Sequence, residues 1–518
     1  MAAIITDQLR ILNAKNFVAG VQSTSNNYYA WIGLPNATDY DANWDSDPPS
    51  PRDCLGQAND YWDTMLALKR IGTSDVSQVV NKNTWQSGIT YDMWRNDITR
   101  DNRSQPSGAS DIYFANYYVM NEDYRVYICL YNNAKPENNF AGGPSLDQPT
   151  FTDLEPREAG NSGDGYIWKY LYTIKPSQAI KFDSTSYIPV PADWSTNADD
   201  AAVYANASTS GQLKIVTIRN RGVGLGTANA IYTNVPIEGD GTGGKATIVM
   251  NNDSKVQSIT VSSGGSGYTY GTIGLEAGGV PTGTTTPTFN VIIPPPGGHG
   301  YDIYRELGAF NVLTYARFEN DTSNPDFITG NQFSRVGLVE NPLKSNGSAL
   351  TDSSVSAVYA LRLTGIGWSS ATYTADSKIL QTVGLGSTAV GKVISYDATT
   401  GVLKYWQDRS NSGFTTSTGQ PGAATSTGYE CFRFTADPTS DGSLTITGGD
   451  TSLGIDTAFT GLSTVINNKT YYLGQDFTLG ISNPESKKYS GNIVYVDNRP
   501  SVTRSSSQKE DVKIILQF

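Results

Sequence analysis

The stretch of sequence that decides the fold class is Gly165-Tyr-Ile-Trp-Lys-Tyr-Leu-Tyr-Thr-Ile174, which Lys175-Pro176 closes. Successive side chains of a β-strand point to opposite faces of the sheet. A period of two therefore places on one face Tyr166, Trp168, Tyr170, Tyr172 and Ile174. Aromatic residues are favoured in strands, so we interpret this face as part of a core or an interface. The alternative is a platform on which sugar rings stack.

Further β runs and two helices surround this strand. Residues 112–120 and 124–131 form two runs, and Asn121-Glu-Asp123 between them has the length and chemistry of a hairpin connection. Residues 391–396 and 401–406 are joined in the same way by Asp397-Ala-Thr-Thr400. Helices are expected over residues 6–18 and over residues 59–71, the second containing Trp62.

The composition indicates a β-rich protein of several domains. The chain has 518 residues, which at roughly 150 residues per domain gives about three or four domains. It contains 52 glycines, 24 prolines and 31 tyrosines, and charged residues make up 17% of it. Many turns joining aromatic-rich strands follow from these numbers. We predict a mainly β, multidomain fold of antiparallel sheets with a few short helices.

The composition also divides the chain into a base and two insertions. From residue 205 it shifts toward Gly, Thr, Ser and Val, and an internal similarity begins. The matched positions are Thr217 with Thr260, Gly222 with Gly265 and Gly224 with Gly267. Two copies of a strand, glycine turn and strand must pack against each other to bury their apolar faces. We predict a base formed by residues 1–204, 301–344 and 485–518, the last carrying closing strands, with inserted β modules at residues 205–300 and 345–484.

The reactive residue types exclude most catalytic classes. His299 is the single histidine and lies in Pro294-Pro-Pro-Gly-Gly-His-Gly-Tyr301, a composition typical of a loop. Cys54, Cys129 and Cys431 are too far apart in sequence for a zinc motif, and an odd number argues against a disulfide framework. We therefore predict no catalytic, cofactor-binding or metal-binding residues, and no enzymatic activity.

Charge and hydropathy exclude two classes of partner. A formal net charge of −12 without clusters of Lys and Arg disfavours nucleic acid. The sequence contains neither a signal-peptide pattern nor a run of about eighteen apolar residues, so membrane insertion and standard export are not expected. Scattered cysteines fit synthesis in a reducing cytoplasm.

Two motifs leave alternatives open. The glycines of Gly222-Val-Gly-Leu-Gly226 and Gly239-Asp-Gly-Thr-Gly-Gly244 are interpreted as turn glycines, because no helix with a Gly-Lys-Ser/Thr ending follows as a phosphate loop requires. A second motif is an acidic group before the aromatic strand, namely Asp153, Glu155, Glu158 and Asp164. These carboxylates form either a solvated loop or the acid pair of a glycosidase.

Several segments, taken in order, resemble one known family. The strongest are Gly163-Asp-Gly-Tyr-Ile-Trp-Lys-Tyr-Leu-Tyr-Thr-Ile-Lys-Pro176, Tyr187-Ile-Pro-Val-Pro191, Gly491-Asn-Ile-Val-Tyr-Val-Asp-Asn-Arg-Pro500 and Ile514-Ile-Leu-Gln-Phe518. Weaker ones are the Trp62 helix and the segment from Gly330-Asn-Gln-Phe333 to Glu340-Asn-Pro342. Together they resemble the T4-like phage baseplate wedge subunit conventionally numbered eight, from contractile-tail phages. The resemblance covers roughly the three parts of the base and omits both modules.

The resemblance implies a structural role in the virion. It implies a non-enzymatic subunit of the tail baseplate wedge that links neighbouring wedge proteins, supports fibre or sheath attachment, forms a homodimer within each wedge and is assembled in the host cytoplasm. Tyr495 and Arg499 lie in a matching segment and are interface candidates, although a core role is the alternative. The competing hypothesis is a tail-associated carbohydrate-binding or depolymerising protein, with the repeated module facing the sugar.

Overall fold

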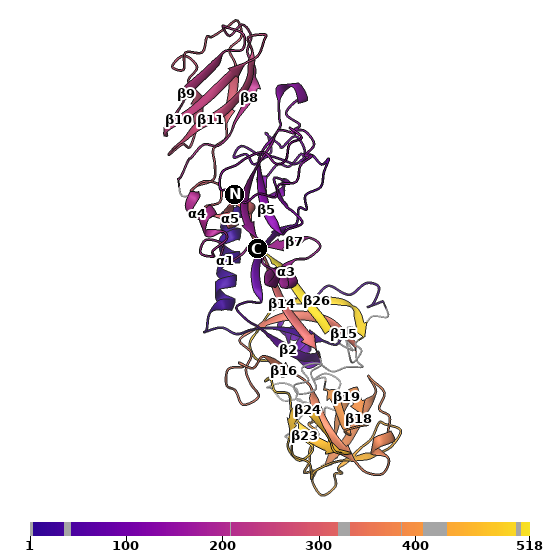
Figure 1. Cartoon of the computed structure of the whole chain (residues 1–518). Coiled ribbons are helices and arrows are strands. Elements are labelled where there is room, and N and C mark those ends of the chain that lie inside the picture. The colour runs from indigo at the N-terminus through magenta and orange to yellow at the C-terminus, as the bar shows by residue number, and fades with distance from the viewer. Residues whose placement is uncertain are drawn as a thin grey trace. The chain divides into compact units, whose positions relative to one another are not determined.

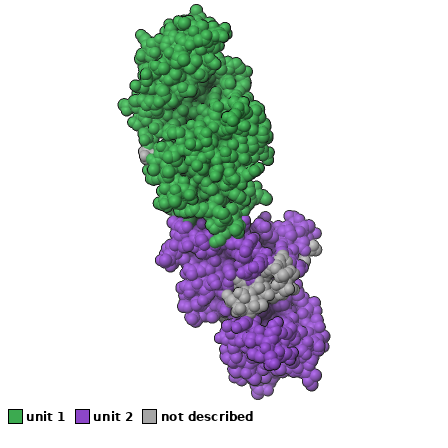
Figure 2. All heavy atoms as spheres, in the orientation of Figure 1, with its two compact units in different colours: residues 1–18, 77–313, 515–518 green, residues 19–76, 314–514 purple. Residues whose placement is uncertain are grey.

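A computed structural model describes residues 4–35, 43–207, 209–319, 332–384, 386–407, 432–503 and 509–518. Within them, strands predominate over a few short helices, and neighbouring strands of the sheets run antiparallel. The predicted fold class is therefore confirmed. The chain forms two compact units: unit 1 contains residues 1–18, 77–313 and 515–518, and unit 2 contains residues 19–76 and 314–514 (Figure 2).

The aromatic strand lies at the centre of unit 1. It forms β6 (Tyr166–Thr173), which pairs with β5 (Arg125–Asn132), the strand labelled in Figure 1. Strand β5 pairs in turn with β4 (Tyr118–Met120). The pairing of β4 with β5 confirms the predicted hairpin. The side-chain oxygen of Asn121 accepts hydrogen bonds from the amides of Asp123 and Arg125 and so stabilises the turn. The first β run is shorter than predicted, since residues 112–114 form the 3-10 helix η1 (Ile112–Phe114).

Short elements complete the rest of unit 1. They are β3 (Val76–Asn81), η2 (Pro136–Asn138), α3 (Pro176–Phe182), β7 (Tyr187–Pro189), α4 (Ala201–Asn206) and α5 (Ile303–Leu307). The predicted first helix is α1 (Asp7–Gln22). The ring of Phe17 lies 5.6 Å from the ring of Phe518, and the amide of Phe518 donates to the carbonyl of Phe310, so the last residue packs on the amino-terminal helix.

The first predicted module forms its own small sheets. Strands β9 (Ile231–Gly239), β10 (Thr242–Met250), β11 (Val256–Ser266) and β12 (Gly271–Ile273) lie in the order β11-β10-β9-β12, while β8 (Val216–Asn220) pairs with β13 (Thr288–Val291). The opening strand of each sequence copy thus pairs with the closing strand of the other copy, because β8 pairs with β13 and β11 with β10. The two copies exchange strands in this way because each copy alone is too small to bury a core.

The glycines of the first motif, Gly222–Gly226, have left-handed backbone conformations typical of turns, whereas Gly243 and Gly244 of the second motif lie in β10. Gly222 and Gly224 have φ angles of +68° and +72°, and the matching Gly265 and Gly267 have φ angles of +59° and +78°. A Cβ atom on Gly265 would lie 2.3 Å from the carbonyl oxygen of Thr242. Only glycine adopts this conformation in this space, and no helix follows that could bind a phosphate.

Unit 2 contains a five-stranded sheet in the order β16-β2-β1-β15-β26. Its strands are β1 (Tyr28–Gly33), β2 (Met65–Ile71), β15 (Gln332–Glu340), β16 (Ser354–Ser356) and β26 (Asn492–Thr503). The helix predicted over residues 59–71 is wrong in its second half, because α2 (Leu55–Thr64) ends where β2 begins. Pairing of β2 with β1 and β16 on both sides outweighs the local helical pattern.

Most of the remaining described strands of unit 2 lie within residues 345–484, the second predicted module, although β16 of that range pairs with β2 in the five-stranded sheet. The module comprises β17 (Tyr359–Thr364), β18 (Lys378–Gly384), β19 (Ser387–Asp397), β20 (Val402–Trp406), β21 (Thr445–Ile446), β22 (Leu453–Ile455), β23 (Gly461–Ile466), β24 (Lys469–Phe477) and β25 (Ile481–Ser482), with the 3-10 helix η3 (Trp368–Ser370). The predicted β19–β20 hairpin is confirmed, and the Asp397 carboxylate accepts from the Thr399 amide at 2.9 Å and from the Thr400 hydroxyl at 2.6 Å. Strands β14 (Asn311–Glu319) and β27 (Lys509–Gln517) are sheet neighbours.

Candidate functional site

The two interface candidates lie on β26, which ends the order of the five-stranded sheet. Tyr495 is half-buried opposite Leu338 on β15, and Arg499 is exposed. Both side chains lie on the face opposite Val496, which packs against the apolar core of unit 2. The Arg499 guanidinium pairs with the Asp497 carboxylate at 2.7 Å on that same face. The structure therefore brings the two candidates onto one face of an edge strand, and neither is fully buried.

The second half of β26 is covered by a segment that begins at residue 43. The Trp44 indole N–H donates to the carbonyl oxygen of Arg499 at 2.9 Å, and the amide of Ser501 donates to the Asp45 carboxylate at 2.9 Å. The side-chain amide of Asn498 donates to the carbonyl of Pro49 at 2.6 Å. These bonds satisfy polar groups of an edge that would otherwise offer itself to another strand.

The first half of β26 instead lines a groove against α2. The groove has a volume of about 460 Å³, and Tyr495, Val494, Leu55 and Tyr489 are among its lining residues. Leu55 is 81% exposed and Val494 is 43% exposed. Burial raises the pKa of the Tyr495 hydroxyl, and the nearby Asp497 carboxylate adds to this effect. We call this feature, formed by residues 51–62 and 489–496, the α2–β26 groove.

Leu55 and Val494 are the groove residues that sequence reasoning missed. Leu55 lies four residues before the start of the helix that the sequence predicts, so it was not expected on a helix at all. Val494 lies in the quoted segment beside Tyr495, but an isolated valine in a strand gives no signal of exposure. The groove depends on sheet order, which joins residues 489–496 to residues 51–62 across most of the chain.

His299 lies in a buried pair with Glu306. The His299 side chain is buried, and its Nδ1 atom lies 2.6 Å from the Glu306 carboxylate. The Trp94 ring packs edge-on against the imidazole, with 4.8 Å between the ring centroids. The second oxygen of Glu306 accepts from the amide of Gly300 at 2.7 Å. No hydroxyl or thiol nucleophile is hydrogen-bonded to this histidine among the described residues, so the pair fixes the loop that re-enters the base.

The four carboxylates before the aromatic strand do not form one cluster, although Glu155 and Glu158 both line a pocket of about 660 Å³. The Asp153 carboxylate pairs with Arg157, and buried Asp164 accepts from the amides of Leu146 and Tyr166. Burial opposes ionisation of Glu155, but its ion pair with Lys214 at 2.7 Å holds the pKa below the usual value. A glycosidase acid needs a raised pKa, so Glu155 lacks the property that protonation of a leaving group requires.

The aromatic strand is core and not a sugar platform. Tyr166, Trp168 and Tyr172 have no exposed surface, and Tyr170 and Ile174 are 2% exposed. The Trp168 ring stacks on Tyr166 at 5.4 Å and meets Tyr91 edge-on at 5.8 Å. A sugar cannot reach these faces in the folded chain.

The described residues contain no cluster of three or more His, Cys, Asp or Glu side chains that could hold a metal ion. No helix among them is both long and apolar enough to cross a bilayer. Cys54 is exposed at the start of α2 and Cys129 is buried in β5, whereas Cys431 lies outside the described residues, as do Gly330 and Asn331 of the weaker matching segment.

Comparison with known proteins connects the amino-terminal region to one family. Residues 3–210, which include the buried aromatic strand, match the family model described as Bacteriophage T4, Gp8. This region is similar to the gp8 family. The baseplate wedge protein gp8 of Enterobacteria phage T4 is 24% identical over 214 residues, which cover 36% of this chain and 60% of that protein. The match thus spans about three fifths of the relative's length.

The region that matches the gp8 model and the groove only partly overlap. Helix α2 and the aromatic sheet lie inside residues 3–210, whereas β26, Tyr495 and Arg499 lie outside them. The resemblance predicted for residues 301–344 and 485–518 therefore stays a prediction. Strand β26 nevertheless pairs with β15, and β15 pairs with β1 of the region that matches the gp8 model, so all three belong to one sheet.

Proposed function

We propose that the chain is a structural subunit of a phage tail baseplate wedge. It links neighbouring wedge proteins and supports the attachment of fibres or sheath, acts without a catalytic site or cofactor, and is assembled in the host cytoplasm into the virion tail. The observation that carries this proposal is the match of residues 3–210 to the gp8 family, whose relative in phage T4 is a baseplate wedge protein.

The side chains of the described residues support a scaffolding role. The most strongly buried aromatic and polar side chains of the protein lie in its core, as those of β6 and the His299–Glu306 pair do. Of the exposed apolar residues, Leu55, Tyr489 and Val494 line an open groove, which is the kind of surface that partners cover. An assembly protein needs such surfaces and no pocket of convergent titratable groups.

We place one contact with a neighbouring wedge protein at the α2–β26 groove. Leu55 and Val494 supply apolar surface that a partner's side chains can cover, and Tyr495 adds a ring with a polar tip. Arg499 and Asp497 do not line the groove and form an ion pair on the face of β26 that carries Tyr495. This surface lies within the predicted base of residues 1–204, 301–344 and 485–518.

Co-expression with the proteins encoded beside this chain tests the proposal. We expect a stable complex by size-exclusion chromatography with light scattering, and a dimer of the 55.8 kDa chain. Val494→Asp should weaken capture of the neighbouring protein at least tenfold, because it places a charge in the groove. Val465→Asp is the matched control, since Val465 on β23 is 67% exposed and lies outside the groove. A chain that stays monomeric and ignores its neighbours contradicts the proposal.

The carbohydrate hypothesis receives a separate test. The burial of the aromatic strand and the ion pair of Glu155 with Lys214 speak against this hypothesis. Incubation with host-surface polysaccharide should therefore yield neither binding nor new reducing ends. Appearance of reducing ends would replace the structural proposal by a depolymerising one. Nucleic acid and membranes are not proposed as partners.

A further inference from the structure

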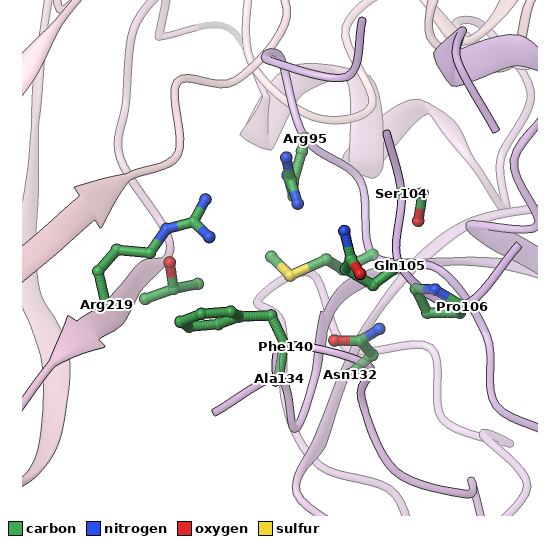
Figure 3. Close-up of a pocket in the computed structure, with 10 residues that line it drawn as sticks. Arg95, Ser104, Gln105, Pro106, Asn132, Ala134, Phe140 and Arg219 are labelled. Carbon is green, nitrogen blue, oxygen red and sulfur yellow. The ribbon is translucent and has the colours of Figure 1, made fainter. Parts of the chain in front are cut away.

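A small pocket in unit 1 lies where β8 of the first module meets the aromatic base. Its walls include Arg95, Ser104, Asn132, Phe140 and Arg219 (Figure 3). Arg95 comes from the loop that follows the buried Met93, and Arg219 comes from β8. Figure 3 shows the two guanidinium groups entering the same space from neighbouring walls. The lining residues include two arginines and no carboxylate.

Arg95 has a buried donor without a partner. The residue is 9% exposed, and its Nε atom donates to the Asp97 carboxylate at 2.7 Å. Its Nη2 atom is fully buried and has no hydrogen-bond partner. A buried charged donor that lacks an acceptor costs more free energy than a neutral one. An acceptor placed in the pocket would remove this cost.

Arg219 adds a second positive charge to the same space. Its Nη2 atom lies 4.0 Å from Asp97 Oδ2, and its guanidinium packs over the Phe140 ring at 4.9 Å. Burial lowers the pKa of Arg219, and the positive charge of Arg95 lowers it further. The two arginines therefore repel each other across the pocket.

The nearby carboxylates do not balance both arginines. Asp97 also accepts from the side chains of Asn102 at 3.0 Å and Asn290 at 3.3 Å, so its oxygens are shared among several donors. The Asp92 carboxylate accepts from the Ser104 hydroxyl and the Asn116 amide instead. One positive charge in the pocket is left without a close counter-charge.

The size and polarity of the pocket limit the ligand. Its volume is about 20 Å³, slightly above the roughly 10–15 Å³ that one water needs. The side-chain oxygen of Asn132 is a second buried group without a partner, and as an acceptor it repels anions. A ligand must therefore be small, carry one negative charge and lie at the arginine end.

We propose that this pocket binds one small monovalent anion of chloride size between the guanidinium groups of Arg95 and Arg219. The anion accepts hydrogen bonds from both side chains and neutralises the positive charge that Asp97 does not balance. Because Arg95 belongs to the base and Arg219 to β8, the bound anion joins the first module to the aromatic core.

Chloride-35 NMR line widths of the full chain test the proposal at constant ionic strength, with gluconate replacing chloride because it is too large for the pocket. We expect a saturable broadening with chloride that Arg219→Gln weakens about tenfold, the effect of one charge-assisted hydrogen bond. Lys245→Gln is the matched control, since Lys245 is an exposed cation on β10 of the same module, and it should leave the broadening unchanged.

A second measurement keeps the test decisive if a variant unfolds. Crystals of the wild-type chain grown in bromide should show an anomalous peak within hydrogen-bond distance of Arg95 Nη2. Line widths that do not saturate, or a crystal without bromide in the pocket, would overturn the proposal. Equal chloride affinity in the Arg219→Gln and Lys245→Gln variants would overturn it as well.

Discussion

Replacing Trp168 by alanine tests whether the aromatic strand holds unit 1 together. Trp168 lies at the middle of β6, has no exposed surface and contacts the rings of Tyr166 and Tyr91. Removing the indole leaves a large cavity that the flanking strand β5 cannot fill without moving. The change alters no exposed residue, so its effect is confined to stability.

The expected cost follows from the packing. Truncation of a buried Trp or Phe to Ala costs about 3–5 kcal/mol, and each aromatic pair contributes about 0.5–1.5 kcal/mol beyond buried area. Since the indole Nε1 atom has no hydrogen-bond partner, no polar bond is lost with it. We therefore expect the free energy of unfolding to fall by about 4 kcal/mol. This is a large part of the roughly 5–15 kcal/mol by which native proteins are stable.

Hydrogen–deuterium exchange of the β5 and β6 amides measures this loss within unit 1 itself. A cost of about 4 kcal/mol corresponds to exchange that is roughly a thousandfold faster, since each 1.4 kcal/mol is a factor of ten. Phe114→Ala is the control, because Phe114 is 62% exposed and its loss should change exchange less than about threefold. Protection factors for Trp168→Ala within tenfold of the wild type would refute the assignment of β6 to the core.

Three further predictions use other parts of the structure. Lys169 is buried, which lowers its pKa to about 8, so the folded chain binds fewer protons than the unfolded chain between that pH and the ordinary lysine value of 10.5. The free energy of unfolding of unit 1 should therefore rise from pH 8 to pH 10 relative to Lys169→Met, and identical pH profiles of the two proteins would exclude this effect. Iodoacetamide followed by peptide mapping should modify exposed Cys54 rapidly and leave buried Cys129, whose thiol pKa burial raises, unmodified until the chain unfolds; equal rates would show that β5 opens readily. Gly265→Ala should destabilise the first module by about 2 kcal/mol or more in thermal unfolding, whereas Gly279→Ala, with a φ of +70° but open space around it, should cost about 1 kcal/mol, and equal losses would refute the crowding at Thr242.

Local features were predictable from the sequence because neighbouring residues decide them. The β4–β5 and β19–β20 hairpins depend on Asn121 and Asp397, whose side chains bind the turn amides directly. The glycines near residues 222 and 265 were likewise predictable, because their positive φ angles are a property of the local backbone. The sequence predicted that the two small copies pack together, but not that β8 pairs with β13 and β11 with β10.

Features that depend on distant pairing were not predictable. The helical pattern of residues 59–71 is overridden after Thr64, because β1 and β16 pair with Met65–Ile71 on both sides. The same sheet places Val494 beside Leu55, although more than four hundred residues separate them. Tyr495 and Arg499 were found only through the resemblance of their segment, and nothing in their spacing indicates which of them a neighbouring loop covers.

The most direct test of the central claim is a cryo-electron microscopy map of contractile tails from the phage whose genome encodes this chain. The structural proposal predicts side-chain density for the chain in the baseplate, with two copies in each wedge and another wedge protein covering Val494 in the α2–β26 groove. A baseplate map in which every density is accounted for by other proteins would contradict it.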